Sequence, residues 1–186
     1  MNIEEKFELA YKKNTSSETL DKLANDEEEY VRRGVAHNEN TTPETLKRLS
    51  DDENEDVRCG VAFNKNTPTK TLDKLYNDEY LYVRYYVAKN KNTSVKTLDK
   101  LANDKDKRVR YEVAKNKNTS VETLDKLSND EKCFVFREVY NNPKTSKETL
   151  LKIEKRMEIC KKCQFYNGFQ KLPSICPYKF EHEILQ

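Results

Sequence analysis

Residues 31–46 read VRRGVAHNENTTPETL, and residues 57–72 read VRCGVAFNKNTPTKTL. The two segments begin 26 residues apart and agree at most positions. Rows of leucine, threonine and valine continue at the same spacing along the chain: Leu20, Leu46, Leu72, Leu98, Leu124; Leu23, Leu49, Leu75, Leu101, Leu127; Thr15, Thr41, Thr67, Thr93, Thr119, Thr145; Val31, Val57, Val83, Val109, Val135; Val35, Val61, Val87, Val113, Val139. Repetition at a fixed period is the signature of a repeat architecture, so we predict five tandem units.

Each unit is predicted to form two short helices. The leucines stand at i and i+3 and the valines at i and i+4, so each set makes one apolar stripe on a helix. The repeated threonine is expected to cap the start of the leucine helix, as a side-chain oxygen can accept a backbone N–H there. A glutamate follows three residues later, at capping-box spacing, in four copies: Glu18, Glu44, Glu122 and Glu148. Pro68 is expected at the first helical position, and Asp26 and its equivalents at the cap of the valine helix.

A single unit cannot be stable alone. About five buried aliphatic side chains contribute about 10 kcal/mol, whereas ordering the backbone and side chains of one unit costs several times more. Stacking against neighbouring units closes this gap, which predicts an all-α solenoid. We therefore divide the chain into a capping half-unit (1–14), a helical solenoid (15–155) and a cysteine-containing C-terminal cap (156–186).

The repeated segment at residues 31–46 resembles the leucine-rich repeat variant family, and the resemblance extends over about residues 5–155. It implies a right-handed superhelix in which α-helices alternate with short 3₁₀-helices, without β-strands, related to HEAT-type solenoids. It also implies a scaffold, and it indicates no particular activity.

Two polar rows recur with the same period: Arg32, Arg58, Arg84, Arg110; and Asn38, Asn64, Asn90, Asn116, Asn142. One interpretation makes the arginines a row of phosphate-binding groups. The other pairs each arginine with an equally regular aspartate and lets the asparagines close the turns between units. We favour the structural interpretation, because networks of repeated pairs fix the alignment of stacked units.

Two positions on the valine helix vary while the frame stays constant, and they lie four residues apart on one face. They hold Arg33 and His37, Cys59 and Phe63, Tyr85 and Lys89, Tyr111 and Lys115, and Arg137 and Asn141. Arginine and aromatic residues are enriched at binding interfaces, so this row predicts a surface for a protein or peptide partner. The alternative is that several aromatic residues of the chain fill gaps between helices, which we favour for Tyr76.

The period stops after Ile153, and the tail carries Cys160, Cys163 and Cys176 followed by His182. Three thiolates and one imidazole would suit a structural zinc ion. An iron–sulphur cluster would require a fourth thiolate, for which Cys133 is the candidate. Proteins with repeats of the resembled kind have been joined to iron–sulphur modules. Reduced cysteines that bind no metal are the remaining alternative.

Composition restricts the function further. Residues 1–142 carry 26 basic and 28 acidic side chains, so the body has little long-range attraction for nucleic acid, which we keep as the alternative partner. Three glycines leave no phosphate-binding loop, no GxSxG motif is present, and the two histidines lie near no nucleophile motif, so we expect no enzyme. No stretch is apolar enough to span a membrane, and the N-terminus does not resemble a signal peptide, so we expect a cytoplasmic protein.

Overall fold

The computed structural model describes residues 1–162 of the chain, with side chains up to Met157. Over this range the chain forms twelve α-helices and no strand. The odd-numbered helices have nine residues each: α1 (Ile3–Tyr11), α3 (Glu29–His37), α5 (Glu55–Phe63), α7 (Leu81–Lys89), α9 (Lys107–Lys115) and α11 (Cys133–Asn141). The even-numbered helices are α2 (Ser17–Leu23), α4 (Pro43–Leu49), α6 (Thr69–Leu75), α8 (Val95–Leu101), α10 (Val121–Leu127) and the longer α12 (Lys147–Lys162).

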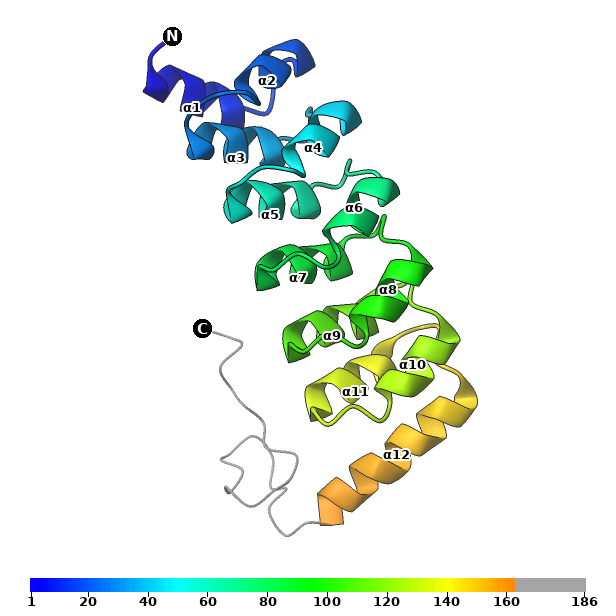
Figure 1. The fold of residues 1–186 in the computed structure, drawn as a ribbon. Coiled ribbons are helices and arrows are strands. Elements are labelled where there is room, and N and C mark those ends of the chain that lie inside the picture. The colour runs from blue at the N-terminus through cyan, green and yellow to red at the C-terminus, as the bar shows by residue number, and fades with distance from the viewer. Residues whose placement is uncertain (163–186) are drawn as a thin grey trace.

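The helices form two columns, with the odd helices in one and the even helices in the other (Figure 1). Each odd helix packs on the next odd helix, and each even helix packs on the odd helices beside it. The predicted all-α solenoid is therefore confirmed. Both helices of a unit are α-helices, where the family resemblance implied alternating α- and 3₁₀-helices. The right-handed sense of the superhelix stays a prediction. No helix in residues 1–162 combines the length and the apolar character that crossing a bilayer requires.

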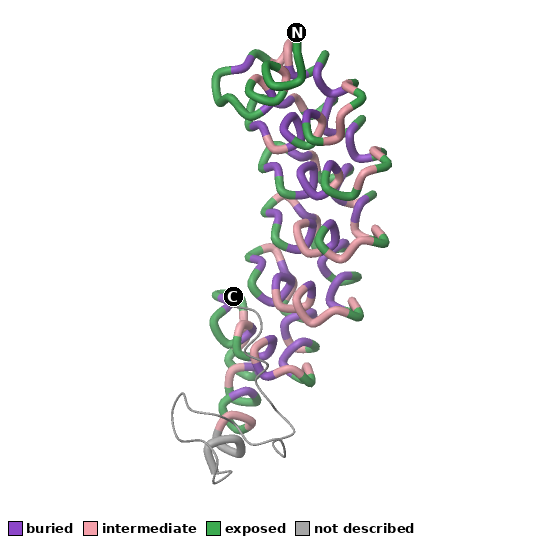
Figure 2. The backbone as a smooth tube through the Cα atoms, turned by 90° about the vertical axis from the view of Figure 1, so that its left-hand side faces the viewer, coloured by how far each residue is buried: buried purple, intermediate pink, exposed green. Residues whose placement is uncertain are grey.

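The repeated leucines and valines join into one continuous core. Leu20, Leu46, Leu72, Leu98 and Leu124 are at most 1% exposed, and both valine rows are fully buried. Buried residues recur at the same place in each turn of the stack (Figure 2). The continuous aliphatic core that stacking of the units requires is therefore present.

The leucine helices begin one residue later than the sequence suggested. The N-caps are Ser16, Thr42, Pro68, Ser94 and Ser120, each directly after the repeated threonine. The threonine hydroxyl instead donates to the carbonyl of the second valine of its unit, as from Thr41 Oγ1 to Val35 O at 2.6 Å. The capping-box prediction was wrong as a consequence, because the glutamates stand at the second helical position. Pro68 is itself the N-cap of α6, not its first residue.

The aspartates expected to cap the valine helices lie two residues before the actual N-caps. Each carboxylate accepts the backbone N–H two residues on, as from Asn54 N to Asp52 at 3.0 Å. The same carboxylate also receives the arginine of the preceding unit. Arg32 Nε lies 2.7 Å from Asp52 Oδ2, and the same pairing joins Arg58 to Asp78, Arg84 to Asp104 and Arg110 to Asp130.

The arginine row is thus structural, as we favoured. Arg84 also donates from Nη1 to the carbonyls of Asp78 and Glu79, so one guanidinium joins the turns of two units. The arginine side chains of the row are only 7–12% exposed. A row of groups already paired in this way is not open to phosphate.

The asparagine row joins units at the C-terminal ends of the valine helices, where each asparagine is the C-cap. Asn90 is buried, and its Nδ2 donates to Ala62 O at 2.8 Å and to Asn64 O at 3.0 Å in the preceding unit. Its Oδ1 accepts Asn92 N at 2.9 Å. Asn38, Asn64, Asn116 and Asn142 make the equivalent bonds. The asparagines close the turns between units as the sequence predicted.

At both ends of the described solenoid, a cation from outside the arginine row makes an interaction that the row makes in the regular units. Lys6 takes the arginine position in the first helix and lies 2.7 Å from Asp26. At the other end Phe136 takes that position and cannot donate. Arg156 of α12 stacks on the Phe136 ring at 4.2 Å and donates to the carbonyls of Ser128 and Asp130. Helix α12 runs through residues 155 and 156, where we placed a domain boundary, without a break.

Candidate functional site

The variable positions lie on the exposed side of the odd helices, and we call this row the stripe: Arg33, His37, Cys59, Phe63, Tyr85, Lys89, Tyr111, Lys115, Arg137 and Asn141. Successive odd helices pack on one another, so the members of the stripe in adjacent units are neighbours. Arg33, Phe63, Lys89, Lys115 and Arg137 are exposed, and His37, Tyr85 and Tyr111 are half-buried. The eight residues that we predicted for binding therefore all have accessible surface on one side of the stack.

His37 and Phe63 form an aromatic pair in the first half of the stripe. Their rings lie 5.5 Å apart, and His37 Nδ1 lies 3.0 Å from Arg33 O. The Phe63 ring also meets the edge of Tyr86 at 5.5 Å. Phe63 nevertheless stays 52% exposed, so this cluster presents an apolar ring to a partner. Arg33 lies beside it and pairs with Asp56 at 3.5 Å.

The two tyrosines of the stripe pack against the core and bond to the next helix. Tyr85 donates its hydroxyl to Glu112 Oε1 at 3.0 Å, and burial together with this carboxylate raises the pKa of Tyr85 to about 12. Burial, followed by the charges of Glu138 and Glu112, also raises the pKa of Tyr111. Both hydroxyls therefore stay protonated and neutral at physiological pH, and both side chains are half-buried.

A lysine lies over each of these rings. Lys89 Nζ lies 5.7 Å from the centre of the Tyr85 ring, and Lys115 Nζ lies 5.8 Å from the centre of the Tyr111 ring. Cation–π contacts of this length hold an ammonium group near the ring without neutralising its charge. The second half of the stripe is therefore both aromatic and positively charged.

Cys59 differs from what its place in the stripe suggested. The variable row predicted an accessible side chain here, but the Cys59 side chain is buried and only 7% exposed. Burial raises the pKa of the Cys59 thiol to about 12, so it stays protonated and unreactive. The stripe is consequently interrupted at this position, and Phe63 alone represents α5.

The stripe extends to α1, which the sequence analysis missed. Phe7 and Tyr11 stand 26 residues before Arg33 and His37, are 46% and 42% exposed, and have ring centres 4.8 Å apart. Subtracting one period from the predicted positions would have found them. Tyr82 lies one helical turn before Tyr85 and carries Arg108 over its ring at 5.6 Å.

Glycine allows the first rings to lie close to the next helix. A Cβ added at Gly34 would lie 2.7 Å from both the Ala10 Cβ and the Tyr11 ring. A Cβ at Gly60 would lie 2.8 Å from the Ala36 Cβ and 2.7 Å from His37 Nδ1. Any larger residue would have to move these helices apart, so the two glycines fix the Tyr11 and His37 rings against their neighbours.

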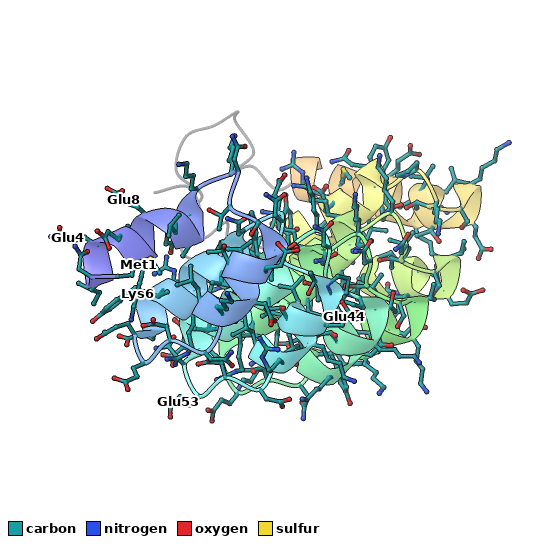
Figure 3. The ribbon with its side chains drawn as sticks, turned by 90° about the horizontal axis from the view of Figure 1, so that it is seen from above. Met1, Glu4, Lys6, Glu8, Glu44 and Glu53 are labelled. Carbon is teal, nitrogen blue, oxygen red and sulfur yellow. The ribbon has the colours of Figure 1, made fainter. Side chains whose placement is uncertain are left out.

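Tyr76 lies outside the stripe, on the even-helix column. It is half-buried against the core, and Lys100 Nζ lies 4.2 Å from the centre of its ring. This placement agrees with the gap-filling role that we favoured. Charged side chains cover the outside of the stack more generally, and Glu8 and Glu53 point away from it (Figure 3).

The predicted metal ligands cannot be placed. Cys160 belongs to α12, but its side chain, together with Cys163, Cys176 and His182, lies outside the described residues. Among the residues that are described, no group of three or more histidine, cysteine, aspartate or glutamate side chains could hold a metal ion. Cys133, the candidate fourth thiolate, is buried at the start of α11. A zinc or iron–sulphur site in the tail therefore stays a prediction.

The helix order, the continuous core and the polar rows together define an all-α solenoid of stacked helix pairs. A solved structure described as a leucine-rich repeat variant with a novel repetitive protein structural motif is similar to this chain. It is 24% identical over 75% of this chain and 71% of its own, with a TM-score of 0.36. This similarity concerns the fold alone, and the fold stands on the helices described above. No family model and no curated protein matches the sequence.

Proposed function

We propose that this protein is a non-enzymatic scaffold that binds a protein or peptide partner along the stripe. One observation supports the proposal: the regular polar residues bond between units, whereas the variable residues other than Cys59 keep accessible surface. The arginine, aspartate and asparagine rows all bond within the solenoid. Aromatic and basic side chains of the types that anchor interfaces remain available on the odd helices.

The stacked geometry favours an elongated partner. The stripe takes residues from each successive odd helix, so its length grows with each unit while its width stays that of one helix face. A solenoid presents this kind of extended surface as a consequence of its repeated structure. We infer that a segment lying along the stack would contact Phe63, Tyr85 and Tyr111 together.

Selection from a random peptide library tests this proposal. The protein is immobilised, and bound peptides are counter-selected against a variant in which Phe63→Ser and Tyr111→Ser remove two stripe rings. Peptides that bind the native protein and lose binding to the variant support the proposal. The variant must keep the cooperative thermal transition of the native protein.

A matched control changes exposed apolar residues on the even column, Val95→Ser and Val121→Ser, which are 46% and 43% exposed. These changes should leave peptide binding intact. The proposal is wrong if no selected peptide depends on the stripe, or if the control pair removes binding as strongly as the stripe pair.

A further inference from the structure

The chemistry of the stripe changes along its length. One position per odd helix, which we call the outer row, holds Tyr11, His37, Phe63, Lys89, Lys115 and Asn141. Its first three members are aromatic rings, and the next two are lysines. A surface of this kind distinguishes one end of a bound segment from the other, because apolar and charged groups prefer different neighbours.

Two further lysines in the turns extend the charged half. Lys91 and Lys117 are exposed and stand two residues after Lys89 and Lys115. We call these four residues the lysine quartet: Lys89, Lys91, Lys115 and Lys117. None of the quartet makes an ion pair with any residue that the structure describes.

The residues at one turn position explain why Lys91 and Lys117 make no ion pair. Lys65 occupies it one unit earlier, and its Nζ lies 2.6 Å from Glu39, the acidic residue at the same position in the preceding unit. The residue one unit before Lys91 is Lys65, and the residue one unit before Lys117 is Lys91. Lys91 and Lys117 therefore each stand one period after another lysine, where Lys65 stands one period after the carboxylate that it pairs with. The quartet is a local excess of positive charge on a nearly neutral body.

We propose that the partner is an extended peptide segment, apolar in the half that lies over α1–α5 and acidic in the half that lies over α7–α9. This inference rests on the proposed function and gives the chemistry of the partner. Apolar side chains of the segment would pack on Tyr11, His37 and Phe63. Carboxylates would pair with the quartet, whose ammonium groups make no ion pair with a described carboxylate, although Lys89 and Lys115 also lie over tyrosine rings.

The spacing of the units sets the spacing of the carboxylates. Packed helices lie about 8–10 Å apart, and an extended chain advances about 3.3 Å per residue. One unit of the solenoid therefore corresponds to about three residues of an extended segment. Acidic residues at every third position would meet Lys89 with Lys91, and then Lys115 with Lys117.

A single-stranded nucleic acid is the competing occupant, since it also combines aromatic stacking with negative charge. The charge distribution favours the peptide. The quartet spans only two units, and residues 1–142 as a whole carry 28 acidic against 26 basic side chains. A polyanion longer than the quartet would meet this acidic excess, whereas a peptide with two or three carboxylates would not.

Fluorescence anisotropy with defined peptides tests the inference. The probe is a labelled 18-residue peptide with leucine at every third position of one half and glutamate at every third position of the other. A second peptide has glutamine in place of each glutamate, and a third has lysine there. The native protein should bind the glutamate peptide at least tenfold more tightly than the glutamine peptide, and the difference should shrink as salt is raised.

Variants locate the charge that is responsible. Lys89→Glu with Lys115→Glu should weaken binding of the glutamate peptide at least tenfold and should favour the lysine peptide instead. The matched control is Lys70→Glu with Lys96→Glu, which makes the same change of net charge at exposed positions on α6 and α8. The control should change the affinity less than threefold. Thermal unfolding should confirm that both double variants are folded.

Three results would overturn the inference. The glutamine peptide could bind as tightly as the glutamate peptide, the control pair could weaken binding as much as the quartet pair, or an oligo-dT strand could displace the peptide at lower concentration than unlabelled peptide does. If library peptides still bind the stripe in these cases, the proposed function stands and only the acidic partner is wrong. If no peptide depends on the stripe, both proposals fail.

Discussion

Asn90 shows how one buried side chain can hold backbone groups of two units at once. Its amide group bonds to Ala62 O and Asn64 O of the preceding unit and to Asn92 N of its own unit. Asn90→Ala would leave these buried groups without partners, at a cost of about 2–4 kcal/mol in the free energy of unfolding. Urea denaturation measures this loss. The control Asn77→Ala, at an exposed asparagine of the neighbouring turn, should cost less than about 0.5 kcal/mol.

Asp106 makes the free energy of unfolding of the protein depend on pH. The Arg108 side chain, with burial acting against it, lowers the pKa of Asp106 below its ordinary 3.8. A carboxyl group with a lowered pKa in the folded state stabilises the fold above its unfolded pKa, and this contribution is lost as the pH falls through the folded value. Asp106→Asn keeps a residue that can cap α9 but removes the charge.

Two urea titrations therefore test Asp106. The variant should be less stable than the native protein at pH 7 by about 1 kcal/mol or less, because the pair with Arg108 is partly exposed. The difference in free energy of unfolding between the native protein and the variant should become smaller as the pH falls from 5 to 3. A gap of constant size over this range would show that the carboxylate charge contributes nothing.

At the scale of single elements, the last helix completes the interactions that the repeat leaves open. In the regular units an arginine donates to the carbonyl six residues before it, as Arg110 does to Asp104 O at 2.9 Å. Phe136 cannot make this bond, and Arg156 of α12 makes it to Asp130 O at 3.1 Å. The C-terminal helix is thus fixed to the solenoid by the same chemistry that joins the units, supplied from a different position in the chain.

Arg156→Met should destabilise the packing of α11 and α12 without affecting the earlier helices. The carbonyls of Ser128 and Asp130 would lose a charged donor, which costs about 1–3 kcal/mol. Amide hydrogen exchange should speed up in α11 and α12 and stay unchanged in α3, α5 and α7, since solenoid units contact only their neighbours. The control is Lys155→Met at the preceding exposed residue. Faster exchange throughout the chain would mean that the stack unfolds as one unit.

The sequence predicted the leucine helices, but it placed the N-cap of each one residue too early. The repeated threonine and the Ser, Thr or Pro after it stand together at each leucine helix, and a hydroxyl at either position can cap. The first hydroxyl is instead bonded to a valine carbonyl six residues back, in a turn whose path the period does not reveal. Local capping rules cannot choose between two adjacent hydroxyls when a contact outside the helix decides.

The stripe shows the same limit for the candidate site. Helical spacing identified Tyr85 and Tyr111, because both positions repeat every 26 residues. The partner of the Tyr85 hydroxyl, Glu112, stands 27 residues away, one position out of step with the period. Such a contact depends on how far one helix is rotated against the next. The sequence therefore predicts which residues face outward together but not which of them touch.

At the scale of the whole molecule, every row of bonds between units steps by one period, so the stack should tolerate the loss of one complete unit. Deleting residues 27–52 removes α3 and α4 and joins Asp26 to Glu53. Asn64 Nδ2 would then donate to Ala10 O and Lys12 O, the carbonyls to which Asn38 donates in the native protein. Gly60 would take the place of Gly34 beside the Tyr11 ring.

The shortened protein should therefore fold and unfold in one cooperative transition, with a smaller denaturant m-value because less surface is buried. Deleting only residues 27–39 removes α3 and places two leucine helices in succession, so the valine, arginine and asparagine rows all lose their alignment. That variant should show no cooperative unfolding by circular dichroism. If both deletions fold equally well, the units are not joined by their aligned rows, and the core alone holds the stack. If neither folds, α3 and α4 contribute interactions that the later units cannot replace.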